Sequence, residues 1–339
     1  MASGVLIVSQ QEAGFHAPPS GLDLIAAGVF LLAVVWFERA STQTLWQRFL
    51  SYCKIAAPVY VVLLSIERYY SFYRFGSFTN TYVTIFAREC HRLDPTLPPN
   101  YPWETPFHIG FLGPLMTPEK SIFLFDPLLV LSILISMLTW KRFSPQVKAY
   151  VLTAFLLLLA YISFYAKYTV WSGDFAWGDR YVSTAAELAA FISVPLLLQY
   201  RLQLGRLAWC AGIGLIALST CIQIASLAFW LPLEIYQMET LGHPTFVIAL
   251  RFKNIVAFAL GKMDQWGLTN HAMMEDDWDY VHITTWNFLP FLLRRVHEAP
   301  AWVVRITFLV WGISIAAFAA TFWQLARVAG LNIEGQDTQ

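Results

Sequence analysis

The sequence predicts an all-α integral membrane protein with about seven transmembrane helices and two long external connections that contain short helices. Hydrophobic residues make up 57% of the 339 residues and charged residues only 13%. In a typical soluble domain about a quarter of all residues are charged. Several apolar runs approach the roughly 20 residues that a helix needs to cross a bilayer. Basic residues gather in every second short loop between these runs, as expected for loops on one side of a membrane.

The predicted membrane segments are the longest apolar runs of the chain. They are Leu22–Phe37, Cys53–Ile66, Ser121–Trp140, Ala149–Ala166, Tyr181–Gln199, Leu207–Trp230 and Ala301–Trp323. The first is taken as a membrane helix because residues 1–21 lack the Lys or Arg of a secretory signal. The second contains Pro58, which a membrane helix tolerates better than a soluble helix does. We expect a membrane region with external hairpins at 1–230, an external amphipathic region at 231–300, and a last transmembrane helix with a cytoplasmic tail at 301–339.

The short loops predict the orientation of the chain. Three of them carry Lys or Arg and fall on the same side of a seven-span protein. Their basic residues are Arg39, Arg48, Lys54, Lys141, Arg142, Lys148, Arg201 and Arg206. By the positive-inside rule this side is the cytoplasm. The N-terminus is then outside and the C-terminus inside.

The segment from Lys167 to Tyr181 concentrates polar and aromatic residues between two apolar runs. Its members of interest are Trp171, Gly173, Asp174, Trp177, Gly178, Asp179 and Arg180. Trp and Tyr favour the membrane interface, because their rings are apolar at one end and polar at the other. One interpretation is therefore a glycine-containing interfacial turn with an aromatic belt. The other is a polar pocket at the membrane surface, formed by the two acids and the arginine.

Other charged residues near predicted helix ends have two interpretations as well. Glu67, Arg68, Arg74 and Arg88 could bind a lipid phosphate, or pair with neighbouring acids at the interface. Asp126 follows the start of a predicted membrane helix, and we expect Lys120 or Arg180 as its partner. Glu187 is an isolated acid at membrane depth, where a hydrogen-bonding role competes with a proton relay.

The sequence predicts no cofactor and no nucleic acid partner. The formal net charge is zero, and the four cysteines are dispersed. The histidines do not occur at the spacing of metal ligands, and no nucleotide-binding motif is present. The acidic stretch Met274–Tyr280 could bind a divalent cation, but it lacks EF-hand spacing and is typical of a solvated loop.

Three stretches, taken in order, resemble the C-terminal half of bacterial GT-C-type membrane glycosyltransferases, which include protein mannosyltransferases. These enzymes show an R-F-G turn, a G-x-L-x-S-P segment that ends in P-L-L, and a W-x-G-G-x-x-W-G-x-R-Y hairpin. The corresponding residues are Arg74–Gly76, Gly113–Leu129 and Trp171–Tyr181. The resemblance covers roughly Ala56 to Leu198.

The resemblance implies transfer of a sugar from a polyprenyl-phosphate carrier on the external face of a bacterial cytoplasmic membrane. It places Arg180 and Tyr181 at the mouth of the donor pocket, with Trp171 and Trp177 as pocket aromatics. Lys120 and Arg74 would lie near the lipid phosphate. Cationic groups would stabilise the departing phosphate, and a carboxylate would take the proton of the acceptor.

The chain also departs from the family. The acidic external loop that carries the general base of these enzymes is missing here. Asp174 stands where the family has glycine and Asp179 where it often has proline, so these two acids are the candidate catalytic substitutes. The leading hypothesis is a half-length or split GT-C-like glycosyltransferase, with membrane lipids and a second membrane subunit as possible partners. A non-catalytic membrane subunit is the second hypothesis. A transporter that uses Glu187 and Asp126 is the third.

Overall fold

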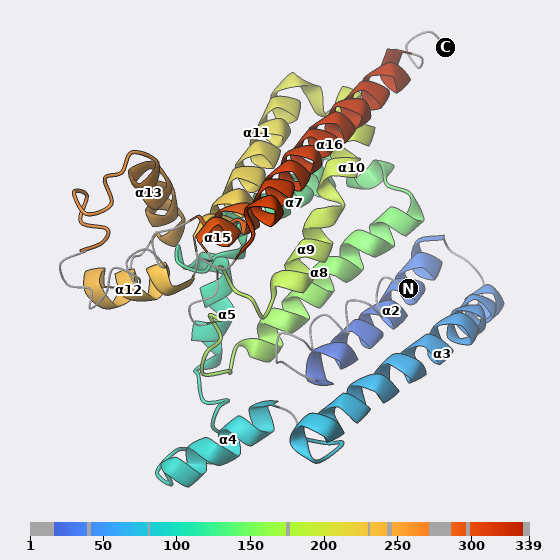
Figure 1. Cartoon of the computed structure of the whole chain (residues 1–339). Coiled ribbons are helices and arrows are strands. Elements are labelled where there is room, and N and C mark those ends of the chain that lie inside the picture. The colour runs from blue at the N-terminus through green and yellow to red at the C-terminus, as the bar shows by residue number, and fades with distance from the viewer. Residues whose placement is uncertain are drawn as a thin grey trace. The chain divides into compact units, whose positions relative to one another are not determined.

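Every regular element in the part of the chain that the structure, a computed structural model, describes is a helix (Figure 1). The described residues are 17–38, 42–80, 82–173, 177–229, 231–242, 246–270, 286–295 and 299–334, and they contain no strand. The chain divides into two units, Met1–Leu215 and Ile216–Gln339. The predicted all-α fold is confirmed.

The helices of the first unit include five of the seven segments predicted to enter the membrane. They are α2 (Ala17–Glu38), α3 (Thr42–Phe75), α4 (Tyr82–Leu93), α5 (Phe107–Met116), α6 (Ile122–Phe125), α7 (Pro127–Thr139), the short 3₁₀ helix η1 (Trp140–Arg142), α8 (Pro145–Tyr165), α9 (Ser183–Phe191) and α10 (Ser193–Gln199). The next helix, α11 (Arg201–Ala228), runs across the boundary between the units. The second unit contains α12 (Leu231–Leu241), α13 (Val247–Ala259), α15 (Leu289–Arg295) and α16 (Ala301–Glu334).

Among the described residues, four helices are long and apolar enough to cross a membrane. These spans are Trp46–Phe75 of α3, the whole of α8 and α11, and Ala301–Thr321 of α16. The predicted helix at Cys53–Ile66 is thus much longer than its apolar run. Its extension beyond that run carries Tyr69, Tyr70 and Tyr73, all exposed.

Two predicted membrane segments are interrupted helices. Ser121–Trp140 breaks at Asp126, whose carboxylate accepts a hydrogen bond of 3.2 Å from the Leu128 backbone N–H and so caps α7. Tyr181–Gln199 breaks at Ile192, between α9 and α10. Pro195 has no N–H to donate to the carbonyl of Phe191, which explains why the first helix does not continue regularly.

The core of the first unit is built around α8, which packs against α2, α5 and α9 (Figure 1). The buried face of α9 consists of small residues, Ala185, Ala186, Ala189 and Ala190. Small side chains let two helix backbones approach closely, and van der Waals packing then stabilises the pair. The hydroxyl of Tyr150 joins the two helices further by donating to the carbonyl of Leu188 at 2.7 Å.

The three basic loops lie at one end of this helix group. Arg48 forms an ion pair with Glu38, and the side-chain amide of Gln146 donates to the same carboxylate at 2.5 Å. The hydroxyl of Tyr200 donates to the carbonyl of Arg142 at 3.2 Å. Contacts between loops that are far apart in sequence thus bring together the regions that the charge pattern assigned to one side.

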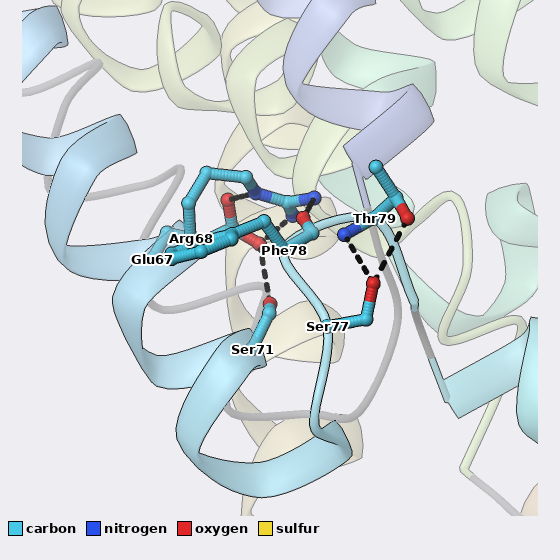
Figure 2. Close-up of polar contacts among 6 residues, drawn as sticks. All are labelled: Glu67, Arg68, Ser71, Ser77, Phe78 and Thr79. Atoms are coloured by element: carbon cyan, nitrogen blue, oxygen red, sulfur yellow. Dashed lines mark hydrogen bonds and ion pairs between the residues drawn. The ribbon is translucent and has the colours of Figure 1, made fainter.

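The R-F-G turn at the end of α3 is held by polar contacts (Figure 2). Arg68 pairs with Glu67 and donates a 2.9 Å hydrogen bond to the carbonyl of Phe78. Gly76 adopts a left-handed conformation with φ of 67°, and its N–H donates to the carbonyl of Phe72 at 2.8 Å. A glycine is favoured here because other residues rarely adopt this conformation. The Glu67–Arg68 pair therefore supports a helix end, which agrees with the interfacial-pairing interpretation of these two residues.

The second unit has its own core and a buried polar network. Arg251 pairs with Glu234 and donates to the carbonyl of Phe229 at 3.1 Å. The side-chain amides of Gln237 and Asn254 form two reciprocal hydrogen bonds of 2.9 Å. The short helices expected between residues 231 and 300 are present as α12, α13 and α15. The acidic stretch Met274–Tyr280 lies outside the described residues.

We predict that Gly110→Ala destabilises the first unit. A β-carbon on Gly110 of α5 would lie 2.0 Å from the backbone oxygen of Ala166, which cannot move like a side-chain end. Overpacking of this kind costs about 1–3 kcal/mol, so thermal unfolding in detergent should begin at a lower temperature. Gly214→Ala is the matched control, because no atom lies within 4 Å of that added carbon. Equal unfolding temperatures for the two variants would contradict the close approach of α5 to the end of α8.

Candidate functional site

The hairpin between α8 and α9 is anchored on α5 by one aromatic ring. A β-carbon on Gly113 would lie 2.1 Å from Cη2 of Trp171, so the ring occupies the space that the glycine leaves. The hairpin backbone turns at Gly173, whose N–H donates to the carbonyl of Val170 at 2.9 Å. Gly113 and Trp171 belong to different stretches of the proposed family resemblance, and the structure brings them into contact.

Lys120 joins the same two stretches through a polar contact. Its side chain is only 4% exposed, and Nζ donates to the carbonyl of Gly178 at 3.4 Å. Gly178 is left-handed, with φ of 66°, and its backbone lies against the ring of Phe125. That ring meets Trp177 edge to face, with centroids 5.0 Å apart. Lys120 and Trp177 therefore both take part in holding the hairpin against the α6 segment.

Asp179 is buried at the end of the hairpin. It is 5% exposed, and Oδ1 accepts a hydrogen bond of 3.1 Å from the backbone N–H of Tyr181. Oδ2 is buried and has no hydrogen-bond partner among the described residues. Burial raises the pKa of Asp179 to about 7, although the backbone hydrogen bonds and the charges of Lys120 and Arg180 oppose this rise. An acid in this position can hold a proton near neutral pH.

Arg180 presents its guanidinium at the surface of the hairpin. Nη2 donates to the hydroxyl of Tyr181 at 3.0 Å, and the guanidinium carbon lies 5.1 Å from the centroid of that ring. Tyr181 is 6% exposed and stacks on Tyr165 of α8, with centroids 4.9 Å apart. A rigid aromatic stack thus fixes the base of an exposed arginine, and an arginine held in this way is suited to a phosphate or carboxylate.

The structure gathers only part of the predicted site. Lys120, Trp171, Trp177, Asp179, Arg180 and Tyr181 share the hairpin and the α5–α6 region. Arg74 instead contacts its own helix and the turn: Nη1 donates to the hydroxyl of Tyr70 at 3.3 Å, and the guanidinium lies over the ring of Phe75. Asp174 lies outside the described residues.

Asp126 does not form the ion pair that the sequence predicted for it among the described residues. The sequence suggested Lys120 or Arg180 as its partner, because a buried acid needs a compensating charge. The carboxylate instead caps α7 through the Leu128 N–H, and Lys120 donates to Gly178. A backbone N–H at a helix start serves such an acid because the positive end of the helix dipole favours negative charge. Glu187 lies within electrostatic range of Asp126.

Asp23 is a candidate that the sequence analysis missed. It lies near the start of α2, and the hydroxyl of Tyr161 on α8 donates to its Oδ1 at 3.1 Å. Tyr161 is followed one turn later by Tyr165, which stacks on Tyr181 of the hairpin. A single acid at the N-terminal end of the first apolar run was the signal available in the sequence. Only the packing of α2 on α8 shows which residues it meets.

The described residues hold no group of three or more His, Cys, Asp or Glu side chains that could bind a metal ion. The described part of the hairpin therefore offers an exposed cation, a buried acid and stacked aromatic rings, which are Arg180, Asp179 and Tyr181 on Tyr165. This combination is able to bind an anionic head group beside an apolar surface.

We predict that Asp179→Asn changes how stability depends on pH. The pKa of Asp179 is about 7 in the folded chain against an ordinary value of 3.8, so the folded state binds more protons between these values. Stability of the native protein should therefore fall as pH rises from about 4 to 7, by on the order of 1 kcal/mol per pH unit at most. The asparagine variant lacks this loss and should be the more stable chain at pH 8.

The measurement is the unfolding temperature in detergent at pH 4, 6 and 8, where the two chains should agree at pH 4 and diverge above it. If the native chain instead gains stability relative to the variant as pH rises, the charge of Lys120 stabilises the ionised form of Asp179 in the folded state, and the prediction is wrong.

Comparisons of the chain with protein-family models, with curated proteins and with solved structures gave no match.

Proposed function

We propose that the protein is a GT-C-like membrane glycosyltransferase, or a half-length relative of one, that uses a polyprenyl-phosphate-linked sugar. The observation that carries this proposal is the packing of Gly113 and Lys120 against Trp171 and Gly178. Two stretches that resemble the family in sequence thus meet in space around one exposed arginine.

Arg180 is the group that we assign to the donor phosphate. Its planar fork suits phosphate oxygens in a bidentate arrangement, and a positive charge there stabilises the phosphate as it departs. Lys120 is buried and acts on the hairpin backbone, so its charge contributes to the potential of the site rather than to a direct contact. Tyr181 keeps the arginine in place.

The contacts at the two ends of the helix group support the proposed placement in the membrane. The basic loops at Arg48 and Arg142 belong to one end, and the hairpin connects the opposite ends of α8 and α9. By the positive-inside rule the hairpin then faces the external side of a bacterial cytoplasmic membrane, with the N-terminus outside and the C-terminus inside. A sugar carried by a polyprenyl phosphate is reached from this side.

Sugar transfer also needs a base, such as a carboxylate, to take the proton of the acceptor. The burial of Asp179 supports a role in positioning the hairpin, and Asp174 remains the sequence-predicted alternative. A second membrane subunit with an acidic external loop would also supply this group. A non-catalytic subunit that binds the same lipid is the second candidate function, and the burial of both Lys120 and Asp179 favours it, because buried groups do not reach an acceptor.

We predict that Arg180→Ala weakens binding of polyprenyl phosphate by about tenfold or more, the loss expected for a hydrogen-bonded charged group. Binding and sugar transfer should be measured with the purified chain in nanodiscs, using a polyprenyl-phosphate-linked sugar. Arg92→Ala is the control, because Arg92 is an exposed arginine that pairs with Glu89 on α4.

Three results separate the candidates. If the native chain transfers the sugar and Arg180→Ala loses both binding and transfer, the protein is the proposed enzyme. Binding that depends on Arg180, with no transfer by the isolated chain, identifies the non-catalytic subunit or one half of a split enzyme. A chain that binds no polyprenyl phosphate is neither.

A further inference from the structure

The helix α13 of the second unit turns its polar residues toward the protein core. Arg251 and Asn254 are buried, with 3% and 1% of their surface exposed. Arg251 pairs with Glu234 of α12, and Asn254 exchanges two hydrogen bonds with Gln237 of the same helix. A surface helix of a soluble protein has the opposite arrangement, with its charged and polar residues toward water. The outward side of α13 is therefore the side to examine.

The outward residues of α13 recur every three or four positions, from the residue before the helix to the residue after it. They are Phe246, Ala249, Lys253, Val256 and Leu260, and we call them the outer face of α13. The side chains of Phe246, Val256 and Leu260 are 57%, 49% and 57% exposed. Apolar side chains that gather on one exposed face mark an interaction surface.

Hydrogen bonds hold α13 at the end of a membrane span. The helix α11 has the length and composition of such a span and ends at Ala228. Arg251 of α13 donates to the carbonyl of Phe229 at 3.1 Å, and the N–H of Asn287 donates to the carbonyl of Ala228 at 2.9 Å. The segment that follows α11 is thus tied to the point where this span ends.

The same segment is also tied to the next membrane span. Phe291 of α15 meets Phe308 of α16 edge to face, with centroids 5.2 Å apart. Phe288 contacts Trp311 of α16, with centroids 5.8 Å apart. Phe308 and Trp311 both lie within the span Ala301–Thr321. Because the segment is attached to membrane spans at both of its ends, its short helices lie close to the bilayer surface.

The length and the charges of α13 favour the interface of the bilayer over its interior. Its 13 residues extend about 20 Å, whereas the hydrocarbon core is about 30 Å thick. Lys253 on the outer face and Lys262 in the turn after the helix are both exposed. Trp266 of this turn is 38% exposed, and tryptophan favours the membrane interface. The acid of the turn, Asp264, accepts a hydrogen bond of 2.6 Å from the hydroxyl of Thr269.

We propose that the outer face of α13 docks on the surface of an anionic bilayer, with Lys253 and Lys262 at the level of the phospholipid head groups. The apolar side chains enter the acyl region, while the lysine stems lie along it and keep their charges in the polar layer. Interfacial helices bind in this way through their buried apolar area and through attraction to anionic lipids. The assignment is independent of the proposed function, because it uses no residue of the hairpin.

The test measures how deep the outer face lies in the membrane. A nitroxide is attached to Val256→Cys of the full chain in nanodiscs, after the four native cysteines are replaced by alanine. Glu89→Cys is the matched control, because Glu89 is on another short helix, α4, and its side chain is 51% exposed and charged. Oxygen concentrates in the acyl region and a nickel chelate in water. We expect the label at position 256 to be more accessible to oxygen, and the control label to be more accessible to nickel.

A second arm tests the role of the lysines. The label at position 256 should lie deeper in nanodiscs that contain phosphatidylglycerol than in nanodiscs of phosphatidylcholine alone. The double variant Lys253→Gln and Lys262→Gln should lose this difference. Lys141→Gln should keep it, because Lys141 is an exposed lysine of η1 that belongs to the other unit.

Three outcomes would overturn the proposal or one of its parts. If nickel reaches position 256 as easily as position 89, the outer face meets water and the proposal is wrong. If neither reagent reaches position 256, a protein surface covers the outer face, and the bilayer is not its partner. If the label lies equally deep in both kinds of nanodisc, the lysines do not bind anionic head groups.

Discussion

The close approach of α5 to the end of α8 is the constraint on which the first unit depends. Gly110 meets the backbone of Ala166, and Gly113 meets the ring of Trp171, with no room for a β-carbon at either position. These two contacts fix where the chain leaves α8 and therefore where the hairpin can turn. The aromatic stack of Tyr165 on Tyr181 then follows, because the hairpin must return along the same helix end.

Electrostatics at the hairpin divides the charged residues into two groups. Lys120 and Asp179 are buried, and both form hydrogen bonds with the backbone of the hairpin. Lys120 donates to the carbonyl of Gly178, and Asp179 accepts from the N–H of Tyr181. A buried charge is costly unless it is hydrogen-bonded or paired, so these residues are part of the support of the turn. Arg180 avoids this cost because it is exposed, and its position is set by Tyr181.

Composition and periodicity were enough to predict the helical fold and most helix positions, since long apolar runs have few alternatives. They could not place the breaks at Asp126 and Ile192, because a capping acid or a proline within an apolar run is tolerated in a membrane helix. The contact of Lys120 with Gly178 was equally hidden, since it depends on how two distant turns pack. Asp23 was overlooked because it is a single acid and its partner Tyr161 is far away in sequence.

The sequence motifs and the packing together favour one surface of the first unit as the place of function. The basic loops occupy one helix end with ion pairs such as Arg48–Glu38, while the hairpin carries its exposed cation at the ends of α8 and α9. Arg180 is exposed at the hairpin, and its guanidinium donates to the hydroxyl of Tyr181, which stacks on Tyr165 of α8. The aromatic stack therefore sets the position of a cation at the end of the helix group opposite the basic loops.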